Sequence, residues 1–196
     1  MRVILIAIST ILFSFTTISD NTTDRLGVKG PLEFSKTKYH LAWTNKPNEN
    51  YYVQEYLPEK EKVEHFNQML TIHLFITDLT AKDAVLQKVK ELDERRKTDK
   101  VCKYTVNESP DSKEFMTDFL LSESKDDKVI ILEFNIYRYK QIEISNNKKA
   151  IVVYAYSKRS YGDDIPAFFR TIKQDRISYL NEMISTAIPV ISLDSK

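Results

Sequence analysis

The pattern of hydrophobic and polar residues along the chain predicts a series of strands. Two aromatic-rich runs, 39–44 and 51–57, flank a polar stretch that contains Pro47, which predicts two strands joined by a turn. Five further segments are alternating or continuously apolar, and they predict strands at 71–77, 101–106, 115–121, 128–139 and 149–159. Asn146 and Asn147 lie between the last two segments and supply a turn.

Apolar residues recur at helical spacing in three other segments. A short helix is expected over 59–68. A longer helix follows Thr80, which with Asp83 resembles a capping box in which Asp replaces the usual Glu. Its apolar stripe comprises Ala81, Val85, Val89 and Leu92. A final helix begins near Asp163 and ends before Pro189. Its apolar side comprises Ile165, Phe168, Phe169, Ile172, Leu180 and Ile184.

The order of these segments predicts the fold class. Consecutive strands favour antiparallel hairpins over alternating parallel units. The sequence therefore predicts an α+β fold: a mainly antiparallel β-sheet with two longer helices and one short helix packed on it, forming a single layer-sandwich domain over residues 39–190. Residues 20–38 are polar, contain two glycines and a proline, and predict a flexible N-terminal tether. Residues 191–196 are expected to be a tail.

Residues 1–19 predict a signal peptide. Arg2 gives a positive start, and residues 3–15 form an apolar run that is shorter than a membrane span. Thr17 and Ser19 place small residues at the −3 and −1 positions of a cut after Ser19. An uncleaved N-terminal anchor is the alternative.

The expected destination is the periplasm, with the extracellular space second. The chain is rich in Lys, Ile, Asn and Ser and poor in Gly and Ala, which is typical of an AT-rich genome and fits many bacteria. The single cysteine, Cys102, lies too far downstream of the leader to carry the lipid of a bacterial lipoprotein. No stable membrane span is expected after cleavage.

Composition narrows the classes of function. With 196 residues, 42% hydrophobic and 29% charged, the chain is globular. It carries 29 Lys and Arg against 28 Asp and Glu, which argues against a nucleic-acid partner. One cysteine rules out an intrachain disulfide and a thiolate zinc cage, and three glycines argue against a Gly-rich phosphate loop. No cofactor and no metal site are therefore expected.

The candidate catalytic residues favour structural roles. His73 lies between apolar neighbours on a predicted strand, without a second ligand nearby. His65 and Glu61 are one helical turn apart in the expected short helix, which predicts a surface hydrogen-bonded pair. Cys102 alternates with Tyr104 and is expected to point into the core. We assign no catalytic residue, although a Ser-His-Asp triad drawn from distant residues stays open.

Four tyrosines form the candidate ligand-binding site. Tyr137 and Tyr139 share one side of the strand at 128–139, and Tyr154 and Tyr156 share one side of the next strand. Two adjacent antiparallel strands could present the four rings together, with Arg138 at the rim. The alternative is that a helix covers this surface and the rings are ordinary packing.

The leading hypothesis is an exported, non-catalytic binding or interaction module that uses the tyrosine-rich sheet surface. Its partner would be a protein, a peptide or a glycan. The second hypothesis is an exported hydrolase that uses His73 or His65 with a carboxylate. The third is a structural component of the cell envelope.

Overall fold

The computed structural model describes residues 22–28, 30–144 and 147–193. Within them, eight strands form one sheet in the order β1-β2-β3-β4-β8-β7-β6-β5, and each neighbouring pair is antiparallel. The strands are β1 Leu32–Phe34, β2 Thr37–Asn48, β3 Tyr51–Leu57, β4 Gln68–Ile76, β5 Lys103–Glu108, β6 Glu114–Lys125, β7 Lys128–Ile144 and β8 Lys148–Tyr161. The helices are α1 Ala81–Arg95 and α2 Ile165–Ser185, the latter preceded by the 3₁₀ turn η2 Gly162–Asp164.

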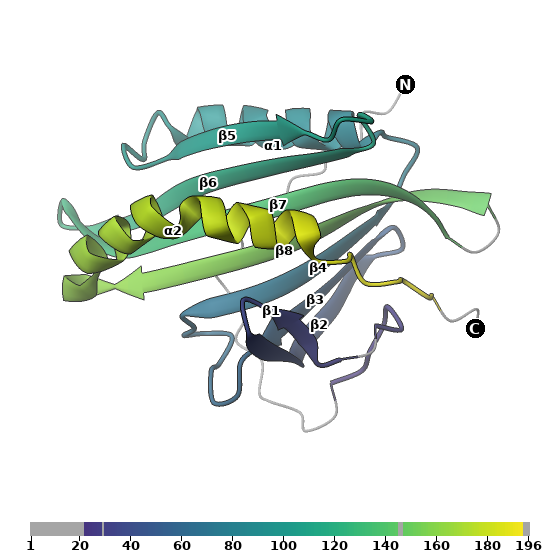
Figure 1. The fold of residues 1–196 in the computed structure, drawn as a ribbon, viewed down its shortest axis with the longest axis horizontal. Coiled ribbons are helices and arrows are strands. Elements are labelled where there is room, and N and C mark those ends of the chain that lie inside the picture. Colours follow the sequence, from purple (N-terminus) through teal and green to yellow (C-terminus); the bar gives the residue numbers. More distant parts are fainter. Residues whose placement is uncertain (1–21, 29, 145–146, 194–196) are drawn as a thin grey trace.

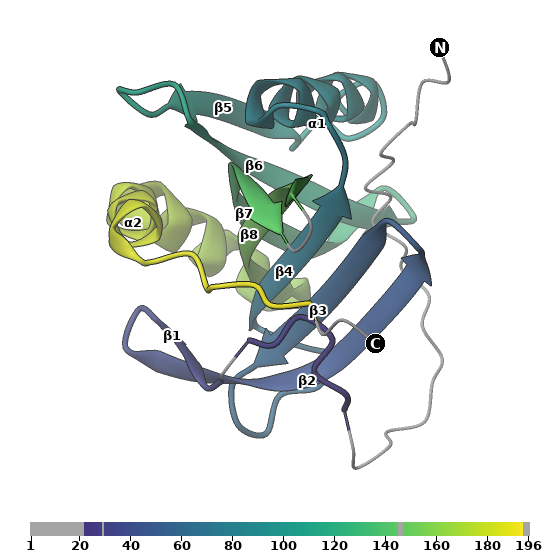
Figure 2. The ribbon, with the colours of Figure 1, turned by 90° about the vertical axis from the view of Figure 1, so that its right-hand side faces the viewer.

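The sheet consists of two meanders, β1–β4 and β5–β8, that join where β4 pairs with β8. The sheet curls around α2, whereas α1 lies on the opposite side over β6 and β7 (Figure 1; Figure 2). We call these two surfaces the α2 face and the α1 face of the sheet. The predicted α+β fold, with a mainly antiparallel sheet and two longer helices, is confirmed.

Helix α1 begins at the predicted cap. The Thr80 hydroxyl accepts the N–H of Asp83 at 3.1 Å, and the Asp83 carboxylate accepts the N–H of Thr80 at 3.0 Å. This reciprocal pair satisfies two backbone donors that a helix N-terminus otherwise leaves unpaired. The buried stripe comprises Ala81, Ala84, Val85, Lys88 and Leu92, so a lysine joins the apolar residues that pack on the sheet.

The alternation of side chains along the strands gives the sheet two cores. On the α2 face, the largest fully buried side chains are Phe34, Tyr39, Tyr56, Phe134, Tyr154 and Tyr156. On the α1 face, the core includes Phe75, Phe115, Phe119, Tyr137 and Tyr139. Strand β8 is buried on both faces from Ala150 to Ser157, which makes it the centre of the molecule.

The short helix predicted over 59–68 is wrong. The segment forms turns and a single bridge between Lys62 and His65. The Glu61 carboxylate accepts the backbone N–H groups of Asn67 at 2.6 Å and Gln68 at 3.1 Å, so the backbone donors are satisfied by a side chain instead of a helical ladder. The His65 ring stacks on Tyr161 at 4.1 Å.

The segment expected to be a flexible tether is packed from Leu26 onward. Leu26 is fully buried, and Phe34 of β1 is 1% exposed. The Gln54 side-chain oxygen accepts the N–H groups of Arg25 at 2.6 Å and Leu26 at 3.1 Å. On the other side, the N–H of Ser192 donates to the Leu26 carbonyl at 2.8 Å. The sequence did not reveal this packing, because the few apolar residues of the segment follow neither a helical nor a strand period.

The predicted tail and leader have different outcomes. Ile191 and Leu193 are half-buried against the core of the α2 face, so the start of the expected tail belongs to the fold. Residues 194–196 lie outside the described residues, as do residues 1–19, on which the signal peptide was predicted.

Helix α2 has a small apolar contact with the sheet. Its buried residues are Ile172, Leu180 and Met183. Phe169 and Ile184, which the periodicity placed on the apolar side, are 46% and 59% exposed. Few apolar side chains therefore anchor α2 to the sheet, and polar contacts must contribute to its position.

Arg138 of β7 fixes the C-terminal end of α2. Its guanidinium donates to the carbonyls of Met183 at 2.8 Å, Ile184 at 3.2 Å and Thr186 at 2.8 Å. It also pairs with the Glu114 carboxylate of β6 at 2.5 Å. The last carbonyls of a helix lack intrahelical donors and carry partial negative charge, so a buried cation is favourable there.

A second arginine fixes the middle of α2. Arg176 donates through Nε and Nη2 to the two oxygens of Asp118 on β6, at 2.6 and 2.8 Å. The same guanidinium donates to the Thr105 hydroxyl of β5 at 2.6 Å. This two-pronged geometry ties α2 to the outer strands of the sheet.

We expect Arg138→Met to destabilise the protein by ~2–4 kcal/mol, because it leaves the half-buried Glu114 with one cationic partner and frees three helix carbonyls. Urea unfolding measures the change. Arg170→Met is the control, since Arg170 is an exposed arginine of α2, and it should shift stability by less than ~0.5 kcal/mol. Equal stabilities of the two variants would contradict the role of Arg138.

The packing of the N-terminal segment is tested at Gly27. Gly27 has φ +62°, and a Cβ there would meet the Ser192 carbonyl oxygen at 2.7 Å. Gly162 has φ +52° with no atom within 4 Å of its added Cβ. Gly162→Ala should therefore cost only the backbone strain of ~1 kcal/mol, and Gly27→Ala clearly more, as measured by thermal unfolding. A free tether would instead give Gly27→Ala no cost.

Candidate functional site

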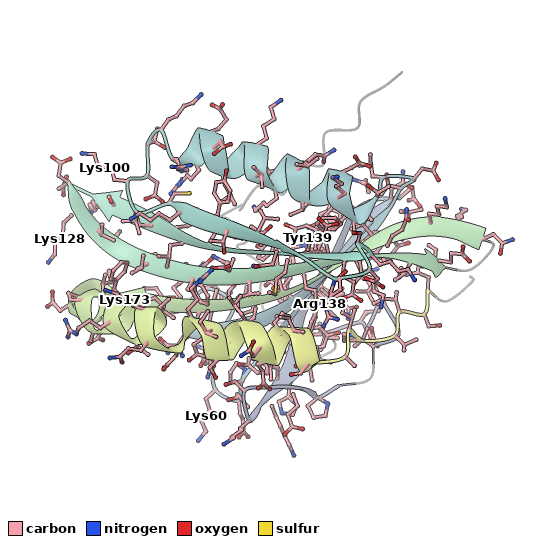
Figure 3. All side chains as sticks on the ribbon, turned by 45° about the horizontal axis from the view of Figure 1, so that its top comes forward. Lys60, Lys100, Lys128, Arg138, Tyr139 and Lys173 are labelled. Carbon is pink, nitrogen blue, oxygen red and sulfur yellow. The ribbon has the colours of Figure 1, made fainter. Side chains whose placement is uncertain are left out.

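The four candidate tyrosines do not form one surface. In the β7–β8 pair, Tyr137 lies opposite Ala155 and Arg138 lies opposite Tyr154. Directly opposed residues share a face of the sheet, so Tyr137 and Tyr139 face α1 while Tyr154 and Tyr156 face α2. Figure 3 shows Arg138 on the side of α2 and Tyr139 on the other side. The prediction of a shared tyrosine surface is wrong, because its register is offset by one residue.

The tyrosines are packing residues of the two cores. Tyr139 and Tyr156 are fully buried, and Tyr154 and Tyr137 are 1% and 7% exposed. The Tyr156 hydroxyl donates to the side-chain oxygen of Gln68 at 3.2 Å. Burial raises the pKa of all four phenols well above the usual value, so they stay neutral. Of the two interpretations of these rings, the structure supports packing.

The strand register instead brings polar side chains together on the α1 face. Thr71 and His73 of β4 lie opposite Ala155 and Val153 of β8. Glu55 of β3 lies opposite Thr71, and Ser157 of β8 lies opposite Asn135 of β7. We name the set of five residues Glu55, Thr71, His73, Asn135 and Ser157 the central polar patch. Glu55 is half-buried, and the other four are less than a tenth exposed.

His73 is held by aromatic neighbours. Its Nδ1 is 2.9 Å from the Tyr51 hydroxyl, and its ring lies about parallel to those of Tyr51 and Phe75. Desolvation by burial, together with a smaller effect of the positive charge of Lys88, lowers the pKa of His73 to about 3. The imidazole is therefore neutral at physiological pH.

Asn135 and Ser157 are joined across the β7–β8 pair. The Ser157 hydroxyl donates to the Asn135 side-chain oxygen at 2.6 Å. Asn135 is 1% exposed, and its amide nitrogen is buried without a hydrogen-bond partner among the described residues. A buried donor without an acceptor costs ~1–3 kcal/mol, so this group is a candidate ligand contact.

Glu55 has a similar unpaired atom. Its Oε2 is buried without a partner among the described residues. The pKa of Glu55 is raised to about 7: desolvation has the largest effect, the Arg159 charge opposes it, and the negative charges of Glu133 and Glu64 add to it. Arg159 is itself bonded to Glu133 through Nε at 2.6 Å. Glu55 is thus a carboxyl group with a raised pKa, and the arginine that acts on it is hydrogen-bonded to Glu133 instead.

Helix α1 and the β3–β4 connection bound the patch. The Lys88 ammonium lies 5.2 and 5.4 Å from the ring centroids of Phe119 and Tyr137 and donates to Glu91 at 3.2 Å. The connection contributes Phe66, whose ring lies 4.1 Å from the Arg159 guanidinium. Neither helix lies over β2, β3 and β4 on this face (Figure 2). Glu55, on β3, is therefore at the side of the patch that α1 leaves open.

Cys102 is buried, as predicted. Its thiol donates to the Leu92 carbonyl at 3.7 Å, and burial raises its pKa. A protonated thiol is a weak nucleophile, so the geometry favours a packing role. The described residues contain no group of three or more His, Cys, Asp or Glu side chains that could hold a metal ion. They also contain no helix long and apolar enough to cross a membrane.

Comparison with known proteins places the chain in a family. A protein-family model matches residues 26–188. The chain belongs to this family. The matched region spans all strands and helices of the described fold and starts at the buried Leu26. The search of curated proteins found no match. Family membership by itself assigns neither an activity nor a ligand to the central polar patch.

The neutral state of His73 predicts an acid-sensitive stability. The folded pKa of about 3 lies below the unfolded value of 6.5, so the unfolded state binds an extra proton between these values. This contribution to stability is complete above pH 6.5 and is lost as pH falls, by up to ~1.4 kcal/mol per unit. We expect His73→Gln to lose less stability than the wild type between pH 7 and pH 5 in urea unfolding.

The pKa shift of Glu55 changes stability with pH in the opposite direction. Because Glu55 is present in both the wild type and His73→Gln, the difference between their stabilities isolates the effect of His73. The folded pKa of Glu55 is raised, and its contribution is lost as pH rises toward about 7. A His73 ring whose NMR signals titrate near pH 6.5 would refute the assignment.

Proposed function

We propose that the chain is an exported, non-catalytic binding module whose ligand contacts the central polar patch. The observation that supports this proposal is the pair of unpartnered polar groups, Glu55 Oε2 and the Asn135 amide nitrogen, on the same face of the sheet. A fold that buries such groups without partners loses stability, and a ligand that supplies a donor to one and an acceptor to the other recovers it. A peptide or a glycan carries both kinds of group.

The low pKa of His73 favours a binding function over hydrolysis. A general base works best with a pKa near the operating pH, whereas the pKa of His73 is about 3. Its Nδ1 is hydrogen-bonded to the Tyr51 hydroxyl and not to a carboxylate, so this geometry does not favour the His–carboxylate pair of the hydrolase hypothesis.

Export is part of the proposal. The expected cut after Ser19 would leave Asp20 as the first residue, ahead of the packed segment that starts at Leu26. Such a cut leaves the described core complete. The periplasm stays the first expected compartment and the extracellular space the second.

The experiment is native mass spectrometry of the protein purified from periplasmic and culture-supernatant fractions. We expect a chain shortened by its leader and a fraction that carries a non-covalent ligand. Asn135→Leu removes the unpartnered donor and should lower the bound fraction about tenfold, whereas Leu86→Ser, at an exposed site of α1, should not change it. Thr71→Val serves as a second test if Asn135→Leu folds poorly. Equal ligand retention in all variants, or an intact leader on cytosolic protein, would overturn the proposal.

A further inference from the structure

The carboxylate of Glu55 lies beside the only tryptophan of the chain. Trp43 of β2 is opposite Glu55 in the β2–β3 register, and Thr71 of β4 is opposite Glu55 on its other side. Directly opposed side chains in an antiparallel pair have Cβ atoms about 4.5–5.5 Å apart. Trp43 and Glu55 are both half-buried, so part of each side chain meets solvent, whereas the Oε2 atom of Glu55 is itself buried.

Arg159 has the largest charge effect on Glu55 and lowers its pKa, although carboxylates are more numerous around it. Glu133 of β7 and Glu64 of the β3–β4 connection both raise the pKa of Glu55, which reports their negative charge nearby. Arg159 of β8 is the one cation among these influences, and its guanidinium donates to Glu133 and lies over the Phe66 ring. The site therefore has a carboxylate surplus that its own arginine does not neutralise.

Lys88, a second cation on this face, is directed elsewhere. Lys88 of α1 lies over Phe119 and Tyr137 and is bonded to Glu91. His73 is neutral, because burial and the Lys88 charge disfavour its protonated form. Neither group supplies a cation to Glu55.

We infer that Glu55 and Trp43 form a site for a cationic group, the ammonium or guanidinium of a ligand. This inference rests on the proposed binding function and names the chemistry of the ligand. A cation would donate to the unpartnered Oε2 of Glu55, and the indole face of Trp43 would add a cation–π contact. The favoured source is a lysine or arginine side chain of a peptide, since the neighbouring Thr71 hydroxyl can bond a peptide backbone.

Tryptophan fluorescence tests the inference at the site itself, because Trp43 is the only tryptophan. The probes are the tripeptide acetyl-Gly-Lys-Gly-amide, the same peptide with norleucine in place of lysine, and the free diamine putrescine. We expect a saturable change with the lysine peptide and none with the norleucine peptide. Stronger binding of putrescine than of the peptide would assign the cation to a free amine and contradict the peptide source.

Glu55→Gln should weaken binding of the lysine peptide about 10- to 100-fold, because the charge-assisted hydrogen bond is lost. Glu108→Gln, at an exposed position of β5, is the matched control and should bind as the wild type does. Since the pKa of Glu55 is about 7 in the free protein, affinity should fall ~tenfold per pH unit below that value. This pH profile of the wild type keeps the test decisive if Glu55→Gln does not fold.

Unchanged fluorescence with every amine, or equal affinities of Glu55→Gln and Glu108→Gln, would overturn the inference. Mass spectrometry then distinguishes failure of the cation site from failure of the proposed binding function. A ligand that is retained by the wild type and lost in Asn135→Leu would leave the binding function standing with a ligand that is not cationic. Absence of any ligand together with absence of amine binding would remove both.

Discussion

The pairing of β4 with β8 is the constraint on which the rest of the structure depends. It joins the two meanders, and its register places His73 opposite Val153 and Thr71 opposite Ala155. A shift of one residue would send every side chain of one strand to the other face of the sheet. The central polar patch would then be divided between the α1 and α2 faces, and the tyrosines of the two cores would be exchanged.

Apolar alternation does not determine this register, because β8 is buried on both faces from Ala150 to Ser157. Specific polar contacts on both sides of β8 favour the observed registers. The Tyr156 hydroxyl reaches Gln68 of β4, whereas Ser157 bonds to Asn135 and Arg159 bonds to Glu133 on β7. Buried polar pairs can thus specify a pairing that hydrophobic burial leaves open.

The same argument explains what the sequence could and could not predict. Helix α1 was found because its cap and its period are local signals, and strands β2 to β8 were found from their own residues, whereas β1 was missed because it lies in the segment expected to be a tether. The prediction of a tyrosine surface was wrong because it required the register between two strands, which is a tertiary property. The prediction of a helix over 59–68 was wrong because the Glu61 carboxylate accepts backbone N–H groups of this segment, a contact that no helical period reveals.

Asn135 and Glu55 were not selected as site residues for a related reason. The signal that could have found them is a polar residue on an otherwise apolar stretch of strand, as in Glu55 of β3. That signal also fits an exposed position, and only the tertiary structure shows that the polar atom is buried and unpartnered. Sequence patterns identify where polar residues occur, whereas the free-energy cost of burying them depends on the residues that pack around them.

The two faces of the sheet differ in what they leave accessible. The α2 face is filled by fully buried aromatic rings, and α2, the segment from Leu26 and the residues up to Leu193 all pack on it. Arg138 and Arg176 then fix α2 in place through carbonyls and carboxylates, with little apolar contact required. The α1 face holds one helix over β6 and β7, whereas Glu55 and Thr71 lie on β3 and β4, where neither helix covers the sheet (Figure 2). In the proposed binding function, a ligand would therefore approach the α1 face on the side of Glu55 and Trp43.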